Sequence, residues 1–230
     1  ESTVGKNYTD SSKDINVILD NRKVELSADA VSLNGAGDRL VVGDGSDAGA
    51  NNAGNDIGAA YLFSFTDADF NGGTLESTIG KGYTGGKNVD VTNLDDGDRF
   101  GNSVALNGAG DRLAVGALDD EGAGNAASAS GAVYLFSFSD ADFNDGTLES
   151  IFGEGYTGGK NVDIGNLVNG NEFGNAVSLN GAGDRLAVGL RLDPGAGNIA
   201  GSPGAAYLFS FTDDNFNGGT LESIVGSGYT

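Results

Sequence analysis

Residues 100–139 decide the fold, and they read FGNSVALNGAGDRLAVGALDDEGAGNAASASGAVYLFSFS. Nearly the same text stands before them, as VSLNGAGDRLVVG and then GAAYLFSF, and again after them, as FGNAVSLNGAGDRLAVG and then GAAYLFSF. The chain is therefore built from tandem copies of one unit. Such repeats have to be recognised first, because they set the architecture of the whole chain.

The repeat period is 73 residues, since Asn34, Asn107 and Asn180 each open the identical string NGAGDRL at that interval. The end of the chain, ESIVGSGYT, matches its beginning, ESTVGKNYT. We therefore predict a divergent first repeat (1–75), two regular repeats (76–148 and 149–221) and the start of a fourth (222–230). This last segment is a candidate blade-completing strand.

Composition excludes several classes of function. The chain of 230 residues has a formal net charge of -21, which repels nucleic acid and anionic lipid headgroups. It contains no Cys, so it has no disulfide and no thiol chemistry, and no His, the commonest general base. No apolar run approaches the roughly 20 residues of a membrane-spanning helix. We expect neither catalysis nor membrane insertion nor a nucleic-acid partner.

Within one copy the pattern predicts four short β-strands. Residues 102–106 form a short strand in which polar and apolar residues alternate. Residues 107–111, NGAGD, form a turn in which Gly supplies positive φ and Asn and Asp bond nearby backbone N–H groups. Residues 112–116 return as a strand buried on both faces. After a variable loop, residues 131–139 place three aromatic side chains on one face, and residues 147–152 form the fourth strand. We predict an all-β fold of three four-stranded antiparallel blades, with no helix.

The copy that begins at residue 100 resembles the FG-GAP repeat, the blade unit of the integrin α-chain propeller and of many bacterial secreted proteins. The matching positions of the second copy are Phe100, Gly101, Ser103, Val104, Ala105, Leu113, Val115, Gly116, Gly131, Val133 and Tyr134. Those of the third copy are Phe173, Gly174, Val177, Leu186, Val188, Gly189, Gly204 and Tyr207. The first copy matches only from Val31 onward. The resemblance implies blades around an axis, usually outside the cell, often in adhesion or ligand binding.

Two departures from the family pattern matter. Many members of the family carry a calcium loop rich in Asp and Asn between the first two strands. Here that turn is NGAGD with one carboxylate, whereas calcium takes six to eight oxygen ligands, so we do not expect calcium there. A closed propeller needs about four to eight blades. Three blades do not close, so we expect an open array, further repeats or other chains.

The turn after the third strand is the candidate calcium site. Oxygen-bearing side chains stand there at alternate positions before Gly or Asp, as at the opening of an EF-hand loop. The residues are Asp67, Asp69, Asn71, Asp140, Asp142, Asn144, Asp213, Asn215 and Asn217. The later part of the EF-hand pattern is missing, and an Asx-capped turn with a buried Phe is the alternative that we favour.

The variable loops between the second and third strands are the candidate binding loops, because loops on a rigid scaffold usually carry binding. Their acidic residues are Asp44, Asp47, Asp119, Asp120, Glu121 and Asp193. The alternative to a binding role, for each of these residues, is neutral sequence drift in a solvent-exposed loop. Asn7 opens the sequence Asn-Tyr-Thr, a candidate glycosylation site.

The sequence predicts a non-enzymatic structural or adhesive repeat protein at a microbial surface or secreted outside the cell. Its expected partner is itself, through head-to-tail association into a ring or filament, or further repeats of the same chain. The alternative is a discrete propeller module that binds a glycan or a surface protein, in which calcium takes part.

Overall fold

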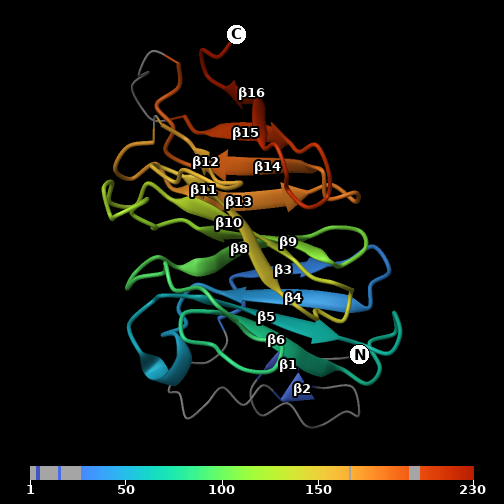
Figure 1. The fold of residues 1–230 in the computed structure, drawn as a ribbon. Coiled ribbons are helices and arrows are strands. Elements are labelled where there is room, and N and C mark those ends of the chain that lie inside the picture. Colours follow the sequence, from blue (N-terminus) through green and yellow to red (C-terminus); the bar gives the residue numbers. More distant parts are fainter. Residues whose placement is uncertain (1–3, 6–14, 17–26, 166, 197–202) are drawn as a thin grey trace.

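The computed structural model describes residues 4–5, 15–16, 27–165, 167–196 and 203–230. These residues form an all-β structure in which three sheets follow one another from the bottom to the top of Figure 1. Its helical content in the described part is one 3₁₀ turn, Ala50–Asn52. Among the described residues no helix has the length and apolar character needed to cross a membrane.

Each sheet is an antiparallel meander, and two of them carry a short fifth strand. The first sheet contains β3 (Ala30–Leu33), β4 (Arg39–Asp44), β5 (Ala59–Ser64), β6 (Thr74–Gly80) and β7 (Val89–Asp90). The second contains β8 (Phe100–Leu106), β9 (Arg112–Ala117), β10 (Ala132–Ser137), β11 (Thr147–Gly153) and β12 (Val162–Asp163). The third contains β13 (Phe173–Leu179), β14 (Arg185–Leu190), β15 (Ala205–Ser210) and β16 (Thr220–Gly226). A separate parallel pair joins β1 (Val4–Gly5) and β2 (Ile15–Asn16).

Local chemistry explains the meander. In the turn between β8 and β9, the Asn107 side-chain oxygen accepts hydrogen bonds from the backbone N–H groups of Gly110, Asp111 and Arg112, at 2.9, 3.1 and 3.1 Å. The Asn107 amide donates in turn to the Asp111 carboxylate at 2.9 Å. These bonds close the hairpin from within, so the turn needs no cation.

The prediction of four strands per sheet is wrong for the first two sheets. Val162 lies beside Phe152 in a parallel pairing, so the apolar patch that the sequence left in a loop is a fifth strand. Phe100 belongs to β8, and a bulge directly after this residue interrupts the pairing of β8 with β9. The predicted boundary between the first and second repeats, at residues 75 and 76, falls inside β6.

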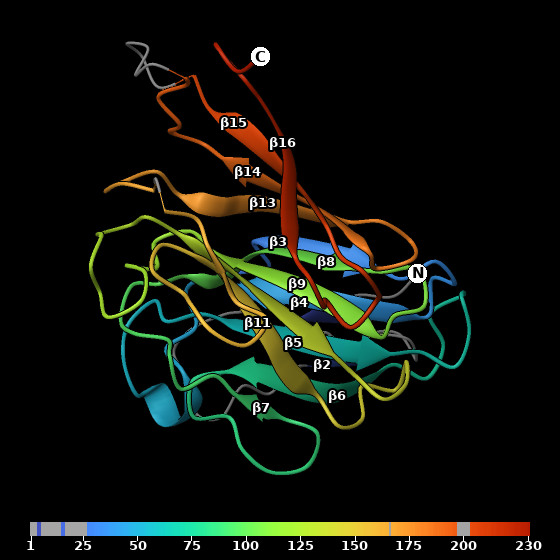
Figure 2. The ribbon, with the colours of Figure 1, turned by 45° about the horizontal axis from the view of Figure 1, so that its top comes forward.

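The sheets pack face to face, chiefly through their first strands. β8 lies against β3 and β4, and β13 lies against β8 and β9, an arrangement visible in Figure 2. Close approach requires glycine: a Cβ at Gly116 would lie 2.0 Å from the carbonyl oxygen of Gly174. The three sheets do not close into a ring.

Aromatic side chains fill the space between the sheets. Tyr134 and Phe136 of β10 and Phe138, which directly follows it, lie on one face, as predicted, and are buried against the first sheet. Phe100 meets Tyr134 edge-to-face with ring centroids 5.4 Å apart. Each interface between sheets is therefore a continuous hydrophobic core, which fixes the spacing of the repeats.

Candidate functional site

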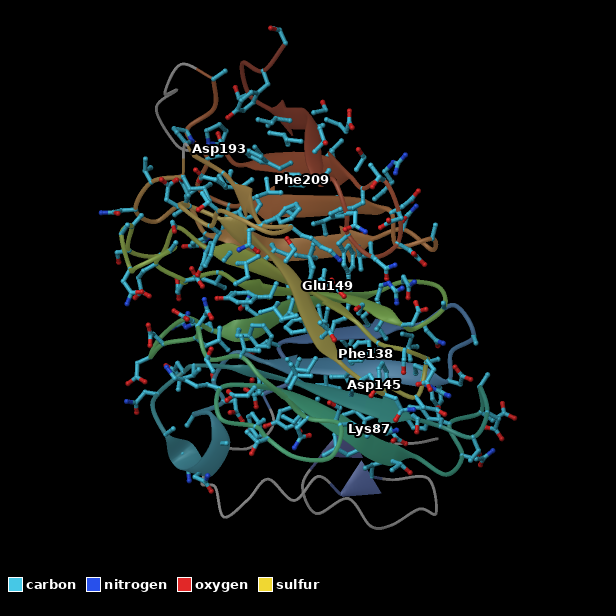
Figure 3. All side chains as sticks on the ribbon, in the orientation of Figure 1. Lys87, Phe138, Asp145, Glu149, Asp193 and Phe209 are labelled. Carbon is cyan, nitrogen blue, oxygen red and sulfur yellow. The ribbon has the colours of Figure 1, made fainter. Side chains whose placement is uncertain are left out.

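Every sheet has two ends, which we call the turn end and the loop end. The turn end holds the tight turns after the first and third strands, and the loop end holds the variable loops. Figure 3 shows Lys87 and Asp145 toward the turn end and Asp193 at the loop end. The candidate calcium turns lie at the turn end, and the candidate binding loops lie at the loop end.

The candidate calcium turn of the second sheet is an Asx-capped turn. The Asp140 carboxylate accepts hydrogen bonds from the backbone N–H groups of Asp142 and Asn144, at 3.0 and 3.3 Å. The Asn144 amide donates to both carboxylate oxygens, at 3.0 and 2.8 Å. The bond from Asn144 outweighs burial and lowers the pKa of Asp140. The turn is complete without a metal ion.

A buried phenylalanine anchors the same turn. Phe143 has φ = 59°, in the left-handed region that a bulky residue rarely adopts. Its ring is buried and meets Phe138 edge-to-face at 5.2 Å. Phe70 and Phe216 have φ values of 58° and 59° at the equivalent places. Packing of the ring compensates for the unfavourable backbone conformation.

Cationic side chains of the first sheet bind this turn. Arg39 donates from Nε to the carbonyl oxygen of Ala141 and from Nη2 to Oδ1 of Asp142, both at 2.6 Å. Lys87 donates from Nζ to the carbonyl oxygen of Asp142 at 2.6 Å and to Glu76 at 2.7 Å. The calcium prediction for these turns stays a prediction, but at Asp142 an arginine from the neighbouring sheet uses the oxygen that calcium would need.

The same contact recurs between the second and third sheets. Arg112 donates from Nε to the carbonyl oxygen of Asp214 at 2.5 Å and from Nη2 to Oδ1 of Asn215 at 2.8 Å. Lys160 donates to the carbonyl oxygen of Asn215 at 2.7 Å and also bonds Glu149. The Arg of the NGAGDR string and the lysine that follows the fourth strand are thus polar connections from one sheet to the next.

At the loop end, one buried aspartate per sheet receives two tyrosines. Asp120 accepts hydrogen bonds from Tyr134 at 2.7 Å, from Tyr156 at 3.1 Å and from the backbone N–H of Gly122 at 2.7 Å. Burial raises the pKa of Asp120 and also that of Tyr134. Asp47 bonds Tyr61 and Tyr83 in the first sheet, and Asp193 bonds Tyr207 and Tyr229 in the third.

These bonds give three of the predicted binding-loop residues a role in holding their loops against the sheet, a role the sequence analysis did not anticipate. The invariant intervals between the aspartates and the tyrosines could have revealed it. Asp44 is also buried and accepts hydrogen bonds from Ser27, and burial raises its pKa. Asp119 pairs with Arg99 at 3.3 Å. Asn7 lies outside the described residues.

Glu121 has a different setting, beside a buried acid that the sequence analysis missed. Asp98 and Glu121 line a cavity of about 320 Å³ at the loop end of the second sheet, together with Asp120. Oδ2 of Asp98 accepts a hydrogen bond from the backbone N–H of Asp95 at 2.7 Å, whereas the buried Oδ1 has no hydrogen-bond partner. Burial, together with repulsion from the carboxylates of Asp120 and Glu121, raises the pKa of Asp98 to about 8.

A comparison with protein families finds a match in the middle of the chain. Residues 93–136 match the family model of the FG-GAP repeat, which confirms the predicted resemblance. The matched segment includes β8, β9 and most of β10, as well as Asp98 and Glu121. No protein with a curated description matches the sequence.

Proposed function

The chain carries an FG-GAP repeat, and we propose that it is a non-enzymatic structural or adhesive repeat protein that acts outside the cell. In this proposal the three sheets are blades of an open, propeller-like array. The array is extended head-to-tail by another blade of the same kind, from a second copy or from further repeats of the same chain. One observation carries the proposal. The same contact joins the first sheet to the second and the second to the third, and the residues that would form it on the third sheet are exposed to solvent.

The polar half of this contact supports the proposal. Arg39 and Arg112 each reach the turn of the next sheet, as described above, and the Arg112 side chain is 9% exposed. Arg185 occupies the equivalent position in the third sheet. Its side chain is 56% exposed, and its hydrogen bond and ion pair within the described part of the chain are to its neighbour Asp184. This exposure supports the proposal that Arg185 binds the turn of a further blade.

The apolar residues of the same contact also support the proposal. In the second sheet, Phe152 of β11 is fully buried against the third sheet. Val225 of β16, its counterpart, is 61% exposed, and Leu208 on the neighbouring strand is only half-buried. The face that is buried in the second sheet is thus exposed to solvent in the third sheet. Burying such a valine stabilises a contact by about 1.5–3 kcal/mol.

The first sheet presents the complementary face. Val31 and Leu33 of β3 are exposed, whereas their counterparts Val104 and Leu106 of β8 are buried against the first sheet. In a head-to-tail arrangement, the face of the third sheet that carries Val225 would meet this face. Such a contact is heterologous, so it gives a ring if the rotation closes and a filament if it does not.

The strand pair near the start of the chain supports the proposal that a preceding blade packs on the first sheet. β1 pairs with β2 in the register that joins β6 and β7, because Val4 lies opposite Ile15 as Ile79 lies opposite Val89. Ile15 approaches Gly73 as Val89 approaches Gly146, the equivalent glycine one repeat later. The strand pair therefore takes the place of the outer edge of a preceding blade, and β16 of a second copy would have to displace it to bind there.

Sedimentation of the chain over a range of concentrations, with electron microscopy of the same samples, tests the proposal. We expect the average mass to rise with concentration, and Val225→Asp to shift association to about tenfold higher concentration, since about 1.4 kcal/mol corresponds to a factor of ten. Val168→Asp is the matched control, because Val168 is similarly exposed but lies in the loop after β12. A mass that stays monomeric at every concentration, or equal effects of both substitutions, would argue against association between copies.

A further inference from the structure

The cavity at the loop end of the second sheet breaks the symmetry of the repeats. Asp98 and Glu121 have Asn171 and Pro194 as their counterparts in the third repeat. In the first repeat, Ala48 stands in place of Glu121. A residue pair kept only in one copy is not required by the packing that all copies share, and such a pair points to a task of its own.

The third sheet shows what this position needs for structure alone. Oδ1 of Asn171 accepts a hydrogen bond from the backbone N–H of Val168 at 2.6 Å, and Nδ2 donates to the carbonyl oxygen of Leu192 at 3.2 Å. Asp98 retains the first bond, from Asp95, but a carboxylate cannot make the second. In the second sheet the buried Oδ1 of Asp98 thus has no donor, since its neighbour there is the carboxyl of Glu121, which as a carboxylate can only accept.

Unpaired buried carboxylate oxygens are costly, and the surroundings increase the cost. Asp98 is 2% exposed. The carboxyl of Glu121 lies within interaction distance, and Asp120 adds a further negative charge. Both Asp120 oxygens are already engaged by tyrosine hydroxyl groups or the Gly122 backbone. A bound cation would offset the repulsion among these acids and supply the missing partner of Oδ1.

The cavity has the size and the donors for such an ion. Its volume of about 320 Å³ exceeds several times the roughly 30 Å³ that one water molecule occupies in the liquid. Neutral oxygens from side chains and from a glycine-rich loop complete its lining: Asn93, Asn125, Thr157, Asn161, Gly122 and Gly124. Carboxylate, amide, carbonyl and water oxygens are the ligands of a hard divalent cation.

We propose that this cavity binds a divalent cation of the calcium class, with Oδ1 of Asp98 and the carboxylate of Glu121 as its charged ligands. The described residues contain no group of three acids arranged to hold a metal ion, so neutral oxygens and water fill the remaining positions. Two carboxylates place the affinity in the weaker range of extracellular calcium modules, with Kd about 10⁻⁴ to 10⁻³ M. The site is separate from the NGAGD turn and from the turns that bind arginine.

Terbium luminescence tests the proposal on the intact chain. Tb³⁺ is a calcium-like probe that a nearby tyrosine sensitises; Tyr156 lines the cavity, and the chain contains no Trp. We expect saturable tyrosine-sensitised emission that millimolar Ca²⁺ displaces. Asp98→Asn and Glu121→Ala should weaken binding at least about tenfold, the effect of losing roughly 1.4 kcal/mol. Both replacements are residues that sibling repeats carry at these positions, so the fold should be retained.

Two further variants keep the test decisive. Glu149→Gln removes an acid of the same sheet that lies outside both the cavity lining and the candidate calcium turns, and it should leave the emission unchanged. Asn171→Asp with Pro194→Glu copies the acid pair into the corresponding cavity of the third sheet, which Asn171 and Pro194 line, and should add a second equivalent of bound ion. Absence of saturable binding, or the same binding in Asp98→Asn as in the unmodified chain, would overturn the proposal. A higher melting temperature of Asp98→Asn combined with no response of the unmodified chain to Ca²⁺ would identify a proton as the partner instead.

Discussion

The hydroxyl of Tyr134 donates a 2.7 Å hydrogen bond to Oδ2 of Asp120, and both side chains are buried. The two residues belong to different segments of one repeat, the third strand and the loop before it. Their bond holds the variable loop against the sheet, so the loop can differ in sequence while its base stays fixed. The same arrangement at Asp47 and Asp193 makes it a repeated element of the scaffold.

Tyr134→Phe should therefore destabilise the chain while preserving its shape. Loss of the hydroxyl leaves a buried carboxylate oxygen with one donor fewer, which costs about 1–3 kcal/mol. For a chain of this size that corresponds to a fall in Tm of about 2–4 °C per kcal/mol. Thermal or urea unfolding measures the change. Tyr229→Phe, at a more exposed tyrosine, should cost less, and an equal cost would contradict the account.

Phe143→Ala should be among the most damaging substitutions at the turn end. The ring is buried against Phe138, and removing a buried phenylalanine costs about 3–5 kcal/mol. Phe70→Ala provides the matched comparison, because Phe70 has the same positive φ but is only half-buried. We expect its free energy of unfolding to fall by clearly less. Similar losses would mean that the backbone conformation, rather than the ring, dominates.

Arg112→Ala should weaken the contact between the second and third sheets. The guanidinium donates to Asp214 and Asn215 across that contact, and charge-assisted bonds of this kind contribute about 1.5–3 kcal/mol. Arg185→Ala removes the same side chain where it reaches no neighbouring sheet in the described part of the chain. It should stay within about 0.5 kcal/mol of the parent protein, as exposed substitutions do. Equal effects in urea unfolding would show that Arg112 acts only within its own turn.

Glu149 should contribute to stability at neutral pH but not in acid. Burial raises its pKa, but hydrogen bonds from Lys160 and Ser137 outweigh burial, and the net pKa lies below the ordinary value of 4.5. The folded state therefore binds this proton less readily than the unfolded state. The stabilisation is present above pH 4.5 and is lost as the pH falls through the folded pKa.

Urea unfolding of Glu149→Gln at several pH values tests this assignment. The variant should be less stable than the parent by about 1.5–3 kcal/mol at pH 7, the range of a hydrogen bond to a charged group, and the difference should shrink toward pH 3. Glu222→Gln is the control: Glu222 bonds Ser210, and no lysine partner is found for it among the described residues. A difference at Glu149 that does not change with pH would remove the ion pair from the explanation.

Local sequence was sufficient for most of the strands. Alternating apolar residues and the NGAGD and DADFN turns are chemical instructions that act over a few residues, so hairpins such as β8–β9 were predicted to within two residues. β12 was missed because a strand of two residues has no periodicity to detect. It exists because Val162 packs on the next sheet, where it approaches Gly219.

The candidate sites depended more on distance in the sequence. Nothing local distinguishes Asp142, which binds an arginine 103 residues away, from a calcium ligand. Asp98 was missed because its significance comes from Glu121, 23 residues later, and from the lack of a donor in a buried space. The comparison with Asn171 was available in the sequence but had no meaning until the cavity was seen.

By itself the sequence determined the period of 73 residues, the all-β class, the turns and the aromatic face of the third strand, because each follows from backbone conformation and side-chain alternation over short segments. Only the tertiary structure decided which acids are neutralised by arginine or lysine, which are held by tyrosine, and which remain unpaired. Those outcomes depend on burial and on the approach of side chains from different sheets. Electrostatic energies change several-fold between water and a protein interior, so the fate of a carboxylate is set by where packing places it.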